Sequence, residues 1–169
     1  MKRIAKFEKV SFAQFAQAWR EQFGSEKGAA AAWEAIPLPR RATVGSAGYD
    51  FCLPFDLTLA PGATAKIPTG IRARIADGWV LMIYPRSGLG FKYRLQLNNT
   101  VGVIDSDYYH SSNEGHIFIK LTNDSNEHRI LSLKAGDGFA QGIFTEFGIT
   151  EDDDAEGIRD GGFGSTSGR

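Results

Sequence analysis

The sequence predicts an all-β domain, a barrel or sandwich of short strands, with a helical segment before it. From Ile36 onward, short stretches alternate apolar and polar residues, which is the period of a half-buried strand. Glycine, proline, asparagine and aspartate separate these stretches, and 20 of the 169 residues are glycine. Frequent tight turns use such residues. The pattern therefore favours many short strands over βαβ units.

The first 35 residues are predicted to form a helical extension. Ser11 and Gln14 match a capping box, and Gly24 supplies a stop. Between them, aromatic and small residues recur at helical spacing: Phe12, Phe15, Ala16, Trp19 and Phe23. Residues 29–33 predict a second short helix. We interpret the pair as amphipathic helices packed on the main domain, with partner binding as the alternative.

Three strands are the clearest in the central segment, 36–150. Residues 71–75 and 117–121 alternate in polarity, and 79–84 form a continuous apolar run. The last segment, 151–169, begins with an acidic run and ends almost wholly in Gly, Ser and Thr. Such a composition cannot form a core, so a flexible C-terminal arm is predicted.

Charge and composition exclude several classes of protein. Nineteen Lys and Arg residues oppose twenty Asp and Glu, a net charge of -1, so no nucleic-acid partner is expected. No stretch approaches the ~20 apolar residues of a membrane span. The single cysteine, Cys52, excludes an internal disulfide and fits the reducing cytoplasm. Charged residues follow the basic start in place of an apolar run, so no signal peptide is expected.

Two segments after predicted strands could bind phosphate or activate water. Arg86, Ser87 and Gly88 offer a cation, a hydroxyl and bare backbone suited to phosphate oxygens, although a simple turn would explain them too. Asp105 lies in an Asp-rich segment with a tyrosine close by, at Tyr108. This segment is either an ordinary turn or the position of a general base.

Three further segments are weaker when each is taken alone. Asp50 is a lone carboxylate at the start of a strand, and Gln141 follows a Gly-Asp turn. The end of the chain is either a flexible tail or a clamp, in which Arg159 pairs with phosphate and Phe163 stacks on a base. The three histidines lack the spacing of a zinc site, so no metal bound directly by protein is expected.

Taken in order, the five segments resemble the five motifs of the homotrimeric dUTP diphosphatase (dUTPase) family. The matching residues are Ala47-Gly48-Tyr49-Asp50, Pro85-Arg86-Ser87-Gly88, Gly102-Val103-Ile104-Asp105-Ser106-Asp107-Tyr108, Gly136-Asp137 through Ala140-Gln141, and Arg159 through Thr166. The resemblance covers residues 36–168. It implies a dUTPase-like β-barrel or jelly-roll. It also implies hydrolysis of dUTP to dUMP and pyrophosphate by attack of water on the α-phosphate, which limits uracil incorporation into DNA and supplies dUMP.

The resemblance also implies a role for each matching residue. Asp105 is the general base, and Asp50 is the candidate to order the water around Mg²⁺, which binds through the triphosphate and water. Tyr108 packs under the deoxyribose. In a homotrimer, the third motif comes from one subunit, the first, second and fourth from a neighbour, and the fifth from the remaining one. The substrate-binding residues are Arg86, Ser87, Gly88, Asn99, Gly102, Val103, Ile104, Tyr108, Gln141, Arg159, Phe163, Gly164, Ser165 and Thr166.

The sequence departs from the family pattern in several places. Gly138 stands where the fourth motif usually has a basic residue, and an insertion at 110–114 displaces a family glycine to Gly115. The last motif is one residue shorter, and the N-terminal helices lie outside the family core. Two rival functions share the fold. A dCTP deaminase would need a catalytic glutamate where Lys120 stands, and a non-catalytic trimeric regulatory binder would not need an intact Asp105.

Overall fold

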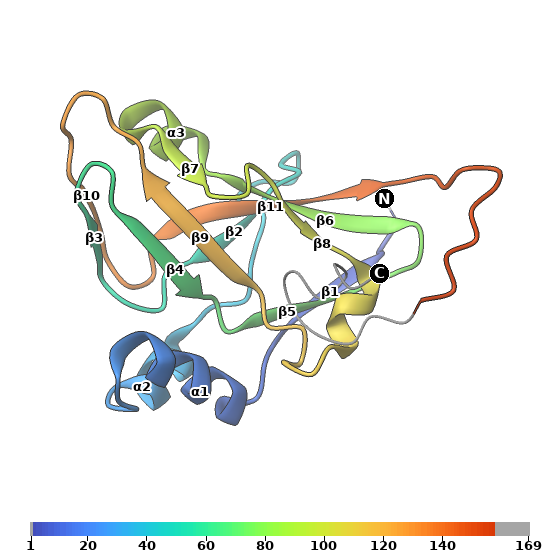
Figure 1. Ribbon diagram of the computed structural model, residues 1–169, viewed down its shortest axis with the longest axis horizontal. Coiled ribbons are helices and arrows are strands. Elements are labelled where there is room, and N and C mark those ends of the chain that lie inside the picture. Colours follow the sequence, from blue (N-terminus) through green and yellow to red (C-terminus); the bar gives the residue numbers. More distant parts are fainter. Residues whose placement is uncertain (1, 158–169) are drawn as a thin grey trace.

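The computed structural model describes residues 2–157, and most of its regular structure is strand (Figure 1). In chain order, the elements are β1 (Ala5–Lys9), α1 (Phe12–Phe23), α2 (Ala29–Ala35), β2 (Tyr49–Cys52), β3 (Leu57–Leu59), β4 (Thr64–Pro68), β5 (Ile71–Ile75), β6 (Trp79–Pro85), α3 (Ser87–Tyr93), β7 (Leu95–Leu97), β8 (Gly102–Ile104), the 3-10 helix η1 (Ser106–His110), β9 (Phe118–Asn123), β10 (Leu131–Leu133) and β11 (Gly138–Glu146). The all-β prediction for the main domain is confirmed.

The strands form small antiparallel sheets around a shared core. Four strands pair in the order β2-β11-β6-β8 and three in the order β4-β9-β7, while β1 pairs with β5 and β10 with β3. The predicted strands at 71–75, 79–84 and 117–121 correspond to β5, β6 and β9. Large buried side chains of this core include Phe51, Ile67, Leu81, Leu121 and Phe139.

The N-terminal helices pack against the main domain, as predicted. Ser11 caps α1 by accepting a hydrogen bond from the backbone N–H of Gln14, and Gly24 ends the helix with φ of 72°. Phe15 is fully buried and approaches Gly70, where a Cβ would lie 3.3 Å from the Phe15 ring. The helices therefore belong to the same hydrophobic core as the strands.

Two elements differ from the sequence-based expectation. Strand β1 lies within a segment predicted to be helical, and it pairs with β5 from Ala5 opposite Ile75 to Lys9 opposite Ile71. Helix α3 replaces the turn predicted after β6. Its two glycines, Gly88 and Gly90, each disfavour a helix by about 1 kcal/mol relative to alanine. Pairing with β5 decides the structure of β1, whereas α3 forms without fully burying any of its side chains.

A buried histidine joins α1 to the strands. His116 is fully buried between Phe15 and Phe118, and its Nε2 accepts a hydrogen bond from the backbone N–H of Gly70 at 2.9 Å. Burial lowers the pKa of His116 to about 3, because desolvation disfavours the charged imidazolium. His116 is therefore a neutral structural residue near pH 7.

The C-terminal segment is described only in part. Residues 151–157 are exposed and contain no helix or strand, while the rest of the predicted arm lies outside the described residues. The proposed boundaries at 35 and 150 remain predictions. Within residues 2–157, no helix combines the length and apolar character needed to span a membrane.

Candidate active site

Three of the five motifs meet at one end of the four-stranded sheet. Gln141 on β11 lies opposite Asp50 on β2 and opposite Tyr84 on β6. Arg86 and Ser87 follow directly after β6. The sheet register therefore brings residues far apart in the chain to one edge. There they line a cavity of about 420 Å³, together with Ala42, Ser46, Ala47, Gly48 and Ile143.

Arg86 is the cation of this polar cavity. Its Nε lies 3.3 Å from Oδ1 of Asp50, and its Nη1 donates to the carbonyl oxygen of Gly138 at 3.3 Å. The Arg86 and Asp50 side chains are 45% and 32% exposed. An ion pair this exposed contributes ~0–1 kcal/mol to stability. The guanidinium can therefore exchange its carboxylate partner for an anionic ligand at little cost.

Gly138, which stands where the fourth motif usually has a basic residue, lies against the guanidinium of Arg86. A Cβ at Gly138 would lie 2.6 Å from Nη1 of Arg86. A basic side chain at this position would therefore require Arg86 to move. In this chain Arg86 occupies that space and itself makes the ion pair with Asp50.

Gln141 is held in the cavity by close packing. Its Nε2 donates to the carbonyl oxygen of Pro85 at 3.1 Å. On its other side, a Cβ at Gly48 would lie only 2.6 Å from Oε1 of Gln141. Gly48 is thus needed for the amide to keep its position. Sequence reasoning assigned no binding role to Gly48 or Ser46, although Gly48 belongs to the same motif as Asp50 and Ser46 directly precedes that motif.

The third motif lies in a different part of the molecule. Leu81 is opposite Ile104 in the antiparallel pair of β6 and β8. Asp105, the residue after Ile104, therefore lies beside the start of β6, whereas Arg86 comes directly after the end of β6. At ~3.3 Å per residue, the six positions from Val80 to Arg86 place the two backbones roughly 20 Å apart. Figure 1 agrees, with yellow η1 and α3 on opposite sides of the view.

A second cavity adjoins the third motif. It has a volume of about 330 Å³ and a mainly apolar lining that includes the predicted residues Asn99, Gly102 and Ile104. Val103, between them, is 48% exposed. Among the described strands, β8 has a neighbour only on its β6 side, so its other edge has backbone N–H and C=O groups that no strand pairs. Such an edge can form hydrogen bonds with the polar groups of a flat ligand.

Asp105 and Tyr108 flank the start of η1. Asp105 is the N-cap residue of this 3-10 helix, in extended conformation. The Tyr108 hydroxyl donates to the carbonyl oxygen of His116 at 2.8 Å and accepts from Nδ2 of Asn113 at the same distance. Tyr108 is 3% exposed. The tyrosine is thus fixed by Asn113 of the insertion and by the backbone of His116.

Some predicted residues line neither cavity, among them Asp105, Val103 and Tyr108 of the third motif. Gly88 is the second residue of α3 and does not line the polar cavity. Arg159, Phe163, Gly164, Ser165 and Thr166 lie outside the described residues. Among residues 2–157, no group of three or more His, Cys, Asp or Glu side chains could hold a metal ion.

Comparison with known proteins gives a consistent result. Residues 34–167 match the family model described as dUTPase. A deoxyuridine 5'-triphosphate nucleotidohydrolase of Lactococcus lactis subsp. lactis is 41% identical over 134 residues, covering 78% of this chain and 88% of the relative. The enzyme of the same name from Escherichia coli O45:K1 is 43% identical over 137 residues, covering 76% and 86%.

Solved structures support the same fold. The crystal structure of dUTPase from Streptococcus mutans matches with a TM-score of 0.63 and 32% identity, over 86% of this chain and 98% of that one. A dUTPase from phage phi11 of S. aureus, which coordinates a structural Mg(II) ion, has the same TM-score at 19% identity, over 92% and 99%. The second similarity concerns the fold alone.

Proposed function

The chain belongs to the dUTPase family and hydrolyses dUTP, and we propose that its active site is built between subunits. The observation that carries this proposal is the separation of Asp105 from the polar cavity. A general base must come within about 2.6–3.2 Å of the proton it removes, or act through one water. The groups that hold the attacked phosphate must also reach that phosphate. Roughly 20 Å of sheet lies between them in one chain.

A homotrimer resolves this separation. The Asp105 turn of one subunit would face the polar cavity of a neighbour, and the last motif would come from the remaining subunit. Closed rings bring different surfaces of identical chains together in this way. The exposed ion pair of Arg86 and Asp50 fits the proposal, because its guanidinium is accessible to the phosphates of a nucleotide whose base is held by another chain.

In the proposed mechanism, Asp105 takes a proton from the water that attacks the α-phosphorus. Pyrophosphate leaves, and dUMP keeps the new oxygen. Arg86, Ser87 and Gln141 hold the phosphate oxygens and stabilise the charge that develops on them. Arg159 and the residues from Phe163 to Thr166 are proposed to complete this phosphate contact.

Mg²⁺ is proposed to accompany the triphosphate. Asp50 is the single carboxylate among the described residues that line the polar cavity, and oxygen ligands, often through water, suit this ion. When bound, Mg²⁺ would neutralise part of the triphosphate charge. The Asp50 carboxylate, which also pairs with Arg86, would order the water bound to the ion.

Specificity for uracil is proposed to come from the edge of β8. Uracil presents an acceptor, a donor and an acceptor in sequence, which backbone N–H and C=O groups around Val103 can match. Cytosine reverses part of this pattern and would leave buried polar groups unpaired, which discriminates strongly. Asn99, Gly102 and Ile104 support the pocket from inside the cavity. Tyr108 is proposed to pack under the deoxyribose and exclude a 2′-hydroxyl.

The reaction can be tested with dUTP, dCTP and dTTP as parallel substrates. We expect pyrophosphate release from dUTP alone, and in water labelled with ¹⁸O the label should appear in dUMP. Ammonia release from dCTP would instead favour the deaminase, against which Lys120 in the apolar cavity already argues. Label in pyrophosphate would contradict attack at the α-phosphorus.

The role of Gly48 gives a matched pair of variants. Gly48→Ala should displace Gln141 and lower kcat/KM for dUTP by about 10-fold or more, the effect of losing one hydrogen bond to a charged group. Gly45→Ala is the control, because a Cβ there meets nothing within 4 Å. Steady-state kinetics of both variants check the prediction. Equal kcat/KM values would show that Gln141 does not contact substrate.

A further inference from the structure

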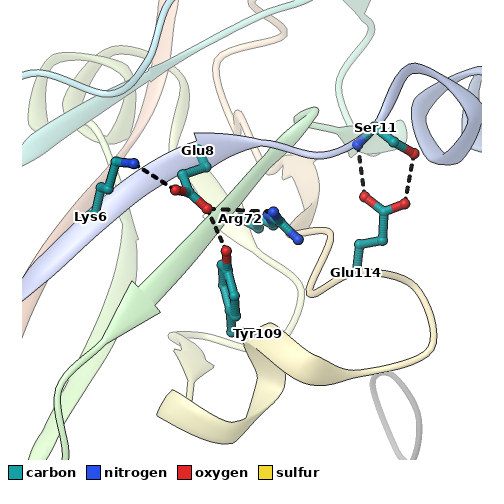
Figure 2. Close-up of polar contacts among 6 residues, drawn as sticks. All are labelled: Lys6, Glu8, Ser11, Arg72, Tyr109 and Glu114. Atoms are coloured by element: carbon teal, nitrogen blue, oxygen red, sulfur yellow. Dashed lines mark hydrogen bonds and ion pairs between the residues drawn. The ribbon is translucent and has the colours of Figure 1, made fainter.

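The N-terminal extension contacts the insertion at 110–114 and the neighbouring Tyr109 of η1 (Figure 2). Both features depart from the family pattern, and they meet beside the turn that carries Asp105. The contacts come from the end of β1 and the start of α1 on one side. On the other side they come from Tyr109, within η1, and from Glu114, in the loop between η1 and β9.

The first contact joins Glu8 to Tyr109. The Tyr109 hydroxyl donates a short hydrogen bond to Oε2 of Glu8. Lys6 and Arg72 also face this carboxylate, at 2.7 Å and 3.5 Å, and Arg72 stacks 4.5 Å above the Tyr109 ring centre. Hydrogen bonds from Lys6 and Tyr109 lower the pKa of Glu8 to about 2. The carboxylate is therefore ionised and tightly partnered near neutral pH.

The second contact joins Glu114 to Ser11, the N-cap residue of α1. The backbone N–H of Ser11 donates to Oε2 of Glu114 at 2.7 Å, and its hydroxyl donates to Oε1 at 2.6 Å. The same hydroxyl oxygen accepts from the backbone N–H of Gln14 at 3.2 Å. These bonds lower the pKa of Glu114. One carboxylate thus connects the insertion to the first turn of α1.

The segment between these contacts is hydrogen-bonded to Tyr108. Asn113 donates to the Tyr108 hydroxyl and accepts from the backbone N–H of Gly115. Gly115 has φ of 71°, and a Cβ there would lie 2.8 Å from the carbonyl oxygen of Tyr108. The loop therefore has little freedom to move independently of the turn. A displacement of Tyr109 or Glu114 would be transmitted to Asp105 and Tyr108.

We propose that Glu8, Tyr109 and Glu114 are positioning residues, through which the N-terminal extension holds the Asp105 turn in its working geometry. The inference rests on the proposed role of Asp105. The extension then contributes to catalysis in this chain by keeping Asp105 in position. Misplacing a reacting group by about 1 Å can cost up to ~10²-fold in rate, so even weak anchoring contacts can affect turnover.

Tyr109→Phe and Glu114→Ala test the proposal, with Asp56→Ala as the matched control. Asp56 also accepts one backbone and one side-chain hydrogen bond, from Ala135 and Lys134, but on the β3 side of the molecule. We expect kcat for dUTP to fall about 10-fold in each test variant, with a smaller change in KM, because the polar cavity that binds the phosphates is intact. The control should keep both constants, and Glu114→Gln should recover part of kcat through its amide oxygen.

Hydrogen exchange separates this inference from the proposed function. Amides of residues 106–116 should exchange faster in Tyr109→Phe and Glu114→Ala than in the wild type, and at the wild-type rate in Asp56→Ala. Unchanged exchange in this loop, or a kcat loss no larger than that of Asp56→Ala, would overturn the positioning role. A wild-type protein without dUTP hydrolysis would overturn the function, and the exchange measurement would still decide whether the extension holds the turn.

Discussion

Asp105→Asn should lower kcat for dUTP by ~10²–10⁴-fold, the usual contribution of a general base. Asparagine keeps the size and shape of the side chain but cannot accept the proton from water. The affinity for a nonhydrolysable dUTP analogue should stay within a few-fold of wild type, because the base is not needed to bind the ground state. Single-turnover kinetics and calorimetric titration with the analogue measure the two effects separately.

Asp77→Asn is the control for this change. Asp77 is exposed in the turn between β5 and β6, so the substitution alters the net charge equally without touching either cavity. Its kcat should equal that of the wild type. If the Asp105→Asn enzyme retains more than about a tenth of wild-type kcat, its loss of rate is smaller than a general base usually contributes. That result would refute the role of Asp105.

Two separately inactive variants should repair one another if the site is shared. Asp105→Asn removes the base and Arg86→Ala removes the cation of the polar cavity. When the two are unfolded and refolded together at a 1:1 ratio, each part of a site is intact with probability one half. Roughly a quarter of the sites in a closed ring then combine an intact Asp105 with an intact Arg86. Activity should rise from near zero to about a quarter of wild type.

The matched control places both defects in one cavity. Arg86→Ala refolded with Gln141→Ala should recover nothing beyond the residual activity of each variant, because both residues line the same cavity of one chain. Mixing folded Asp105→Asn and Arg86→Ala without denaturation controls for slow subunit exchange. Verified mixed trimers of these two variants that stay inactive would show that Asp105 and Arg86 act within a single chain.

The sequence alone identified features that depend on a few neighbouring residues. Alternating polarity over 71–75 predicted β5, since successive side chains of a strand point to opposite faces. Ser11 and Gly24 marked the two ends of α1 because capping is a contact within one turn of helix. Arg86 could be proposed from the chemistry of its own short segment, whereas Asp50 and Gln141 became candidates only because the five segments, taken in order, resemble the family motifs.

What the sequence could not determine depends on pairing across long stretches of chain. Strand β1 forms because β5, more than 60 residues away, offers it an edge. The ion pair of Arg86 with Asp50 forms because Gly138 leaves room for the guanidinium. The separation of Asp105 from the polar cavity follows from the register of β8 on β6. Register and packing are decided by the whole core at once, since shifting a strand by one residue turns its apolar face outward, and no local pattern contains that information.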